Sequence, residues 1–166
     1  GQIFAMAGAK RRHNLLSMRA SALLELALRD RNCEVYGSDM RVCVTASVGL
    51  YTYPDISAVC GEPRFLDGEF DTLLNPKVIV EVLYPSTEAY DRGRKFQRYK
   101  GIGSLEQYVL ISSERVQVEV FTRQGTGVWI SKTITLPGEI IEIASLGCSF
   151  AIAELYQKTG LIERLS

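Results

Sequence analysis

Several features that would classify a chain at once are missing from this sequence. No apolar run approaches the roughly 18 residues that a membrane-spanning helix requires, and no segment resembles a signal peptide. Lysine plus arginine and aspartate plus glutamate each total 19, so the formal net charge is zero. A neutral chain is a poor candidate for a strong passive DNA-binding module. These absences predict a cytoplasmic protein without a membrane partner.

Closely spaced cysteine pairs are also absent. The four cysteines are scattered along the chain as Cys33, Cys43, Cys60 and Cys148, with no Cys-x-x-Cys motif. Zinc sites use such motifs, and disulfide frameworks belong mainly to small secreted proteins. We therefore expect free, buried thiols in a reducing cytoplasm.

The length of the chain suits one domain. A chain of 166 residues can bury a substantial core but is short for two domains, so residues 1–166 are expected to form a single domain. The apolar content of 46% and the charged content of 23% are those of an ordinary globular protein. The first residue is Gly1 rather than Met, so we expect residues to be missing before it.

Local patterns predict a mixed α/β fold. Apolar residues recur at helical spacing over residues 11–31, along a stripe that includes Leu16, Ala20 and Leu23. A charged helix is expected over about residues 88–99, and a short terminal helix over residues 151–156. Strands are expected at residues 2–6, 33–45, 50–60, 78–84, 105–111, 115–123, 128–136 and 139–143. This order describes a mixed β-sheet flanked by helices.

Residues 78–99 are the most informative stretch. Their first part is a β-branched apolar run typical of a buried strand, but Glu81 lies in its middle. An ionised carboxylate in a core strand is costly unless a cation pairs with it or a metal coordinates it. On the helix that follows, Asp91, Lys95 and Tyr99 are four residues apart and therefore share one face.

Three acidic residues on the predicted strands are candidates for a metal site, namely Asp39, Asp55 and Glu81. Two carboxylates that converge at one end of a sheet suit Mg²⁺ or Mn²⁺, and Lys95 would then hold a phosphate oxygen or orient the attacking water. A purely structural alternative stays open. In it Asp55 makes a turn, Glu81 pairs with Arg41 or Lys95, and nothing is catalysed.

A family resemblance rests on four main segments. They are Tyr53-Pro-Asp-Ile-Ser57, Val80-Glu-Val-Leu-Tyr-Pro-Ser-Thr87, Tyr90-Asp-Arg-Gly-Arg-Lys-Phe-Gln-Arg-Tyr99 and Gln107-Tyr-Val-Leu-Ile111. The likeness extends to Gly1-Gln-Ile-Phe, His13, Ser38-Asp-Met-Arg41 and Leu136-Pro-Gly138. In these segments the chain resembles the Uma-two family of restriction-endonuclease-like proteins, which belongs to the PD-(D/E)xK nuclease superfamily.

The resemblance implies a restriction-endonuclease-like fold in which Asp55 and Glu81 bind Mg²⁺ or Mn²⁺. The usual superfamily pattern has a Lys two residues after the second acid, where this sequence has Leu83. The family looks as though it takes that Lys from the following helix, so Lys95 inherits the catalytic role. His13, on the first helix, stands where the superfamily often has an acidic residue, which makes it a candidate to lie near the metal. A hydrogen-bonded core histidine is the alternative.

The remaining site candidates are residues that would support the ligands without binding the metal, namely Asp39, Asp91 and Tyr99. Two positions depart from the family pattern. Val109 follows Tyr108 where an aromatic residue is common, and Ser112 stands where Asp is frequent. Neither is a proposed ligand, so we expect both to alter packing rather than chemistry.

The leading interpretation is a metal-dependent endonuclease that hydrolyses DNA phosphodiester bonds. One alternative is a non-catalytic nucleic-acid-binding or assembly module that keeps the nuclease fold, and another is an enzyme with a different substrate. Enzymes of this fold often cut two strands as a pair of subunits, so we expect a homodimer. The hairpin of residues 115–136, with Trp129 exposed at its rim, is the candidate contact, unless it only closes the sheet of one subunit.

Overall fold

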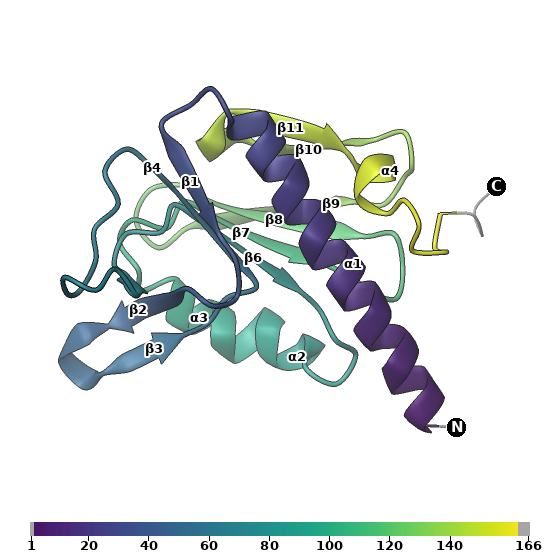
Figure 1. Cartoon of the computed structure of the whole chain (residues 1–166), viewed down its shortest axis with the longest axis horizontal. Coiled ribbons are helices and arrows are strands. Elements are labelled where there is room, and N and C mark those ends of the chain that lie inside the picture. Colours follow the sequence, from purple (N-terminus) through teal and green to yellow (C-terminus); the bar gives the residue numbers. More distant parts are fainter. Residues whose placement is uncertain (1, 163–166) are drawn as a thin grey trace.

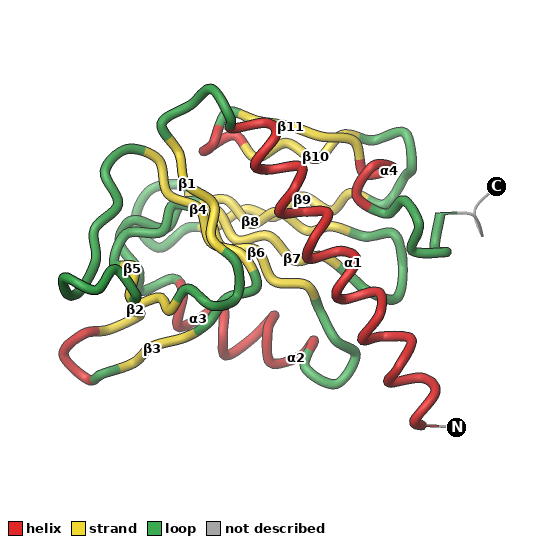
Figure 2. Tube along the Cα trace, in the orientation of Figure 1, coloured by secondary structure: helices red, strands yellow, loops and turns green. Residues whose placement is uncertain are grey.

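The computed structural model describes residues 2–162, with the side chains of residues 10–162. The long helix α1 (Gln2–Leu28) crosses one face of a central sheet, and a helix over residues 88–99 lies on the other face (Figures 1 and 2). The latter helix consists of α2 (Glu88–Tyr90), the π-helical turn η2 (Asp91–Lys95) and α3 (Phe96–Tyr99), and is called the α2–α3 helix below. The predicted mixed sheet flanked by helices is therefore confirmed.

The central sheet has six strands in the order β1-β4-β6-β7-β8-β9. Their bounds are β1 Cys33–Tyr36, β4 Ile56–Cys60, β6 Val78–Val82, β7 Gln107–Ile111, β8 Val118–Arg123 and β9 Trp129–Ile134. Only β6 and β7 run parallel within this sheet, because the α2–α3 helix makes the crossover between them. A turn at residues 124–127 joins β8 to β9 and has positive φ angles at Gly125 and Gly127.

Alternation along the strands gives the sheet two buried faces. On β6 the even positions Val78, Val80 and Val82 join the core that contains the α1 residues Leu16 and Leu24. Ile79 joins a second core with Phe96 and Tyr99 of the α2–α3 helix. Because successive side chains point to opposite faces, Glu81 shares the face of Ile79 and lies under the α2–α3 helix. The register of one strand thus decides which layer receives the carboxylate.

The N-terminal prediction is wrong. Residues 2–6 are not a strand, since α1 begins at Gln2 and its N-terminal end extends beyond the strands (Figure 1). The segment contains several residues of high helix propensity, and one glycine within a long helix is tolerated at a cost of about 1 kcal/mol. The apolar stripe over residues 11–28 is confirmed.

Two predicted strands are each divided by a change of sheet. Residues 33–45 form β1 and β2 (Arg41–Thr45), and residues 50–60 form β3 (Leu50–Thr52) and β4. The chain leaves the ladder at Pro54, which has no N–H to donate. The strands β2 and β3 pair with each other and, with β5 (Thr72–Leu73), form a small sheet beside α3 (Figure 1). The 3₁₀ turn η1 (Ala46–Val48) joins β2 to β3.

Two of the cysteines contradict the expectation of free thiols. Cys33 of β1 and Cys60 of β4 stand opposite each other in an antiparallel pair, and a disulfide joins them. Their separation of 27 residues hid this pairing from the sequence. Cys43 and Cys148 are free and buried, as predicted.

The C-terminal part covers the α1 side of the sheet. The strands β10 (Ile140–Ile143) and β11 (Cys148–Ala151) form a hairpin around the 3₁₀ turn η3 (Ala144–Leu146), and α4 (Ile152–Leu155) follows. The strand β11 was not predicted, whereas β10 and α4 lie where expected. Trp129 is only half-exposed, and its ring packs 5.3 Å from that of Phe96. The predicted exposed rim residue is therefore wrong, and β9 is an edge strand of the central sheet.

Candidate functional site

Asp55 and Glu81 lie next to each other because of the strand register. The pairs Ile56↔Val80 and Ser57↔Ile79 place Asp55, the residue before β4, opposite Glu81. Asp55 lies just outside the strand in which it was predicted, and the backbone N–H of Val82 donates to its Oδ2 atom at 2.8 Å. Asp55 is half-buried, whereas the Glu81 residue is 3% exposed.

The two carboxyl groups differ in their proton affinity. Burial raises the pKa of Glu81 to about 8, even though Lys95 opposes this shift. Burial also acts to raise the pKa of Asp55, but hydrogen bonds from His13 and from the Val82 N–H outweigh it and lower that pKa. A pair of neighbouring carboxyl groups with separated pKa values is a frequent feature of catalytic sites.

Lys95 joins this pair from the α2–α3 helix. Its Nζ atom lies 2.9 Å from Glu81 Oε1 and 3.4 Å from Asp91 Oδ1. Burial disfavours the charged amine, but Glu81 and Asp91 more than compensate and raise the pKa of Lys95. The prediction that Asp91 and Lys95 share the face toward the sheet is confirmed. Two of the three N–H bonds of the ammonium are thereby used, and one is left for a ligand.

Tyr99, on the same face, fixes the position of Glu81. Its hydroxyl donates to Glu81 Oε1 at 3.0 Å and lies 3.1 Å from Thr52 Oγ1 of β3. Since the single Tyr99 proton goes to Glu81, the Thr52 hydroxyl donates to Tyr99. The small β2–β3 sheet is thus connected to the site through Thr52.

His13 approaches the site from α1. Its Nε2 atom lies 3.3 Å from Asp55 Oδ2, and its ring stacks on that of Tyr84 with centroids 4.2 Å apart and an interplanar angle of 3°. Stacking and hydrogen bonding together fix the imidazole beside the Asp55 carboxylate. His13 therefore lies at the site as a partner of a candidate ligand.

Asp39 and Arg41 do not reach the site. Asp39 is exposed in the turn between β1 and β2, so the expectation that it supports the ligands is not met. Arg41 bonds to Thr72 Oγ1 at 2.8 Å and lies 3.6 Å from Asp71 Oδ1, which removes it as the partner of Glu81. The change of sheet after β1 explains both results.

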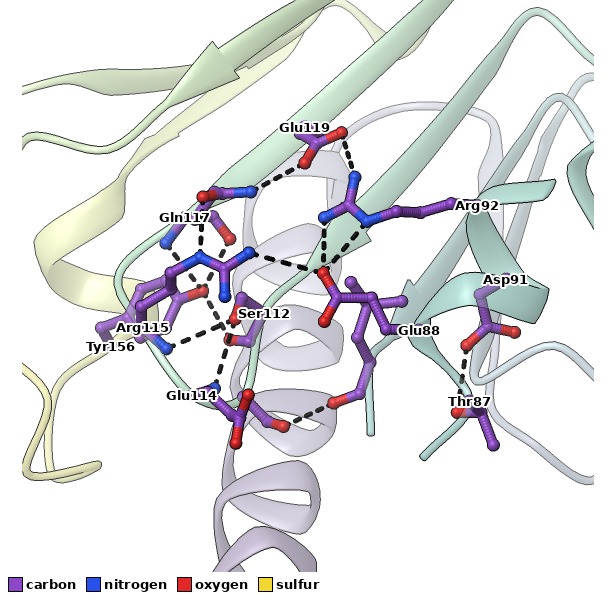
Figure 3. Close-up of polar contacts among 12 residues, drawn as sticks. Thr87, Glu88, Asp91, Arg92, Ser112, Glu114, Arg115, Gln117, Glu119 and Tyr156 are labelled. Atoms are coloured by element: carbon purple, nitrogen blue, oxygen red, sulfur yellow. Dashed lines mark hydrogen bonds and ion pairs between the residues drawn. The ribbon is translucent and has the colours of Figure 1, made fainter. Parts of the chain in front are cut away.

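A polar network that the sequence did not reveal holds the start of the α2–α3 helix against β8 (Figure 3). Arg92 bonds to Glu88 at 3.0 Å and also to Glu119, and Arg115 lies 3.4 Å from the same Glu88 carboxylate. On the other side of the helix, Thr87 donates to Asp91 Oδ2 at 3.4 Å. The Arg92–Glu119 and Arg115–Glu88 contacts each join residues 27 positions apart in the chain. Together with the contacts within the helix, they position the segment that presents Lys95.

Ser112, one of the departures from the family pattern, also belongs to this network (Figure 3). Its hydroxyl accepts hydrogen bonds from the backbone N–H groups of Glu114 and Arg115 at 3.2 and 3.3 Å. The Tyr156 hydroxyl donates to the Ser112 carbonyl at 2.7 Å. Ser112 thus shapes the turn between β7 and β8, in agreement with a structural role.

Asp55 and Glu81 supply oxygen atoms of the kind that a small divalent cation takes as ligands. The Val82 N–H and His13 Nε2 contact the Oδ2 atom of Asp55. The Tyr99 hydroxyl and Lys95 Nζ contact the Oε1 atom of Glu81. The other oxygen of each carboxylate is free of these donors. Within the described residues no group of three or more His, Cys, Asp and Glu side chains forms a complete metal cage. Mg²⁺ is commonly held by only one or two carboxylates, with water and substrate phosphates as the other ligands.

Two cavities larger than the one beside Lys95 lie elsewhere. Cavities of about 480 and 310 Å³ adjoin β9 and β10 and share Lys132, Glu142 and Ala144, and none of the predicted site residues lines either one. A cavity of about 80 Å³ is lined by Lys95 and Tyr99. The candidate site is therefore identified by its charged side chains and not by the volume of a cavity.

The fold resembles that of a solved structure, and the sequence matches a known family. The structure resembles a crystal structure described as a putative nuclease of the DUF820 group from Anabaena variabilis, with a TM-score of 0.70 and 16% sequence identity over 89% of this chain and 82% of the other. At that identity the likeness shows a shared fold. Residues 1–153 match the family described as "Putative restriction endonuclease" (Uma2), and the chain belongs to this family.

Two uncharacterised proteins of Synechocystis sp. are related over most of their length. One is 36% identical over 157 residues, which are 95% of this chain and 80% of the relative. The other is 37% identical over 143 residues, which are 86% of this chain and 79% of the relative. The resemblance inferred from the motifs is confirmed. Within the described residues no helix is long and apolar enough to cross a bilayer.

Proposed function

We propose that this protein is an Mg²⁺- or Mn²⁺-dependent endonuclease that hydrolyses DNA phosphodiester bonds. The observation that carries the proposal is the convergence of Asp55, buried Glu81 and Lys95 at one end of the sheet, with Lys95 Nζ 2.9 Å from Glu81. Membership of a restriction-endonuclease family and the nuclease fold support it.

Each residue of this cluster would have a different role in the reaction. Asp55 and Glu81 would hold the cation, which when bound lowers the pKa of a coordinated water and offsets charge on the phosphate. Lys95 would direct its remaining N–H bond to a phosphate oxygen or to the attacking water, and Asp91 keeps its ammonium charged. His13 and Tyr99 would hold Asp55 and Glu81 in orientation.

The non-catalytic module remains the second candidate because of one specific observation. Glu81 Oε1 already has two partners, Lys95 and Tyr99, so the cluster is a satisfied buried network even without a metal. A protein that kept this network for stability alone would fold identically and cut nothing.

The partners follow from the proposed reaction. DNA would be the substrate, and a homodimer would supply two sites for the two strands. The hairpin of β8 and β9 offers the free sheet edge for such a dimer, with exposed Val128 and Ile130. Sedimentation equilibrium would test the dimer, and the cytoplasmic location stays a prediction.

The decisive experiment combines metal binding with cleavage. Mg²⁺ and Mn²⁺ are titrated into wild type and Glu81→Ala by calorimetry, and both proteins are then incubated with supercoiled plasmid. We expect binding and nicking by the wild type and neither by the variant, with circular dichroism to confirm that both are folded. A folded wild type that binds no divalent metal would contradict the proposal and favour the non-catalytic module.

A further inference from the structure

A small cavity opens beside Lys95, between the β2–β3 hairpin and the α2–α3 helix. Its volume is about 80 Å³. The lining residues come from both elements and are Val44, Leu50, Tyr51, Thr52, Tyr90, Lys95, Arg98 and Tyr99. Lys95 is therefore shared, since it contacts Glu81 at 2.9 Å and also forms part of this cavity wall.

The lining has the chemistry of an anion site. Among the described residues that line the cavity none is acidic, and two are cations, Lys95 and Arg98. Arg98 donates from Nη1 to the Tyr90 hydroxyl at 3.2 Å, which leaves the hydroxyl proton and the other guanidinium N–H bonds for a ligand. Arg98 and the Tyr90 hydroxyl supply these donors, and the Lys95 ammonium adds positive charge beside them.

Several residues that line the cavity are fixed by contacts with each other or with neighbouring residues. Thr52 and Tyr99 close its inner end through their 3.1 Å hydrogen bond. The guanidinium of Arg41 lies 5.0 Å from the centroid of the Tyr51 ring, and Arg41 is itself bonded to Thr72. These contacts fix the part of the lining formed by Tyr51, Thr52 and Tyr99.

The size of the cavity limits what can enter. At about 80 Å³ the cavity has room for more than one water molecule. A phosphate group can enter such a space, whereas a nucleobase cannot be enclosed in it.

We propose that this cavity binds a phosphate of the DNA strand that adjoins the phosphate being cut. The assignment rests on the proposed function, because the Asp55 and Glu81 carboxylates define where cleavage would occur. Lys95 lies between the two places, so one strand that follows the surface from the carboxylates to Arg98 would present successive phosphates to both. Arg98 then positions the strand and does not take part in the reaction.

Arg94 provides a matched control for Arg98. Both side chains are exposed on the α2–α3 helix, one turn apart, but only Arg98 lines the cavity. Binding of a fluorescently labelled DNA duplex is measured by anisotropy at fixed ionic strength in EDTA, so that no cleavage is required. We expect Arg98→Gln to weaken binding about tenfold and Arg94→Gln about twofold or less, with unchanged melting temperatures. Equal losses from the two variants would overturn the proposal, since that result indicates only general charge attraction.

The source of the phosphate is tested with modified and free ligands. A neutral methylphosphonate is placed at single positions along the duplex. It should weaken wild-type binding at one linkage next to the cleaved bond and leave Arg98→Gln unaffected there. Inorganic phosphate should compete only weakly; if it binds as tightly as the duplex, the site belongs to a free anion and the strand assignment is wrong.

DNA binding and cleavage, measured on the wild type and on Arg98→Gln, also distinguish the cavity proposal from the endonuclease proposal. Cleavage with an unchanged affinity in Arg98→Gln would reject the cavity and keep the endonuclease. Selective loss of affinity in Arg98→Gln, in a wild type that never cuts with Mg²⁺ or Mn²⁺, would keep a strand-phosphate site and reject the endonuclease.

Discussion

The two faces of the central sheet are equally buried but differ in the side chains that they bury. On β6, Val80 is 2% exposed and faces α1, and its neighbour Glu81 is 3% exposed and faces the α2–α3 helix. The α1 face is a continuous apolar core, from Leu16 of α1 to Phe150 of β11. The other face is apolar except around Glu81, where Lys95 contacts both Glu81 and Asp91.

This difference separates stability from chemistry. Burial of apolar side chains contributes roughly 25 cal/mol per Å², whereas a buried ion pair recovers little more than its own desolvation cost. The α1 face should therefore hold the fold, and the α2–α3 face should hold the reactive groups. Four substitutions test this division.

The largest effect is expected from Leu24→Ala on the α1 face. Leu24 is 1% exposed, so its truncation should reduce the free energy of unfolding by about 2–5 kcal/mol through lost burial and the cavity left behind. Urea unfolding followed by circular dichroism measures this. Leu26→Ala is the control, because Leu26 is 59% exposed on the same helix and should change stability by about 0.5 kcal/mol or less. Comparable losses would show that α1 is not anchored by this face.

Lys95→Met should reduce the rate of DNA cleavage rather than the stability of the fold. It removes the group proposed to stabilise the transition state, so plasmid cleavage should slow by about 100- to 1,000-fold, or roughly 2.7–4 kcal/mol. Metal binding by calorimetry should persist, because Asp55 and Glu81 remain. Arg94→Met, an exposed neighbour on the same helix, should cut normally. Retention of a tenth of the activity or more by Lys95→Met would remove Lys95 from the catalytic role.

Glu81 should make stability depend on pH. Burial raises its pKa from the ordinary 4.5 to about 8 in the folded protein. The folded state therefore holds this proton more tightly, so the stability it contributes is present below pH 4.5 and is lost as the pH rises through about 8. Between pH 5 and pH 8 the metal-free wild type should lose about 1 kcal/mol or more relative to Glu81→Gln, by urea unfolding in EDTA. Parallel pH profiles would contradict the raised pKa.

The smallest effect is expected from Arg115→Gln. Its side chain is 52% exposed and pairs with Glu88 at 3.4 Å, so solvent screens the interaction and the loss should be about 0.5 kcal/mol or less. Arg92→Gln should cost more, about 1 kcal/mol, since Arg92 is 29% exposed and contacts both Glu88 and Glu119. Thermal melts at low and high salt compare the two. Equal losses would show that the network in Figure 3 does not position the helix.

The sequence predicted those parts of the candidate site that depend on residues close together in the chain. Glu81 stands out as a carboxylate inside an apolar strand, and the spacing of Asp91, Lys95 and Tyr99 determines one helix face. Asp39 failed because nothing in its own segment shows that the chain changes sheet after β1. The partners Thr52 and Tyr84 were missed for a similar reason, since each contacts a residue far away in the chain.

The sequence by itself determined the elements, the apolar stripe of α1, the buried acid on β6 and the family, because these depend on periodicity and on motifs of neighbouring residues. The tertiary structure alone decided that Asp55 stands opposite Glu81, that His13 reaches Asp55, and that Cys33 meets Cys60. Register and crossover connect residues separated by tens of positions. No local pattern encodes such pairs, because the free energy that selects them comes from burying both faces of the sheet at once.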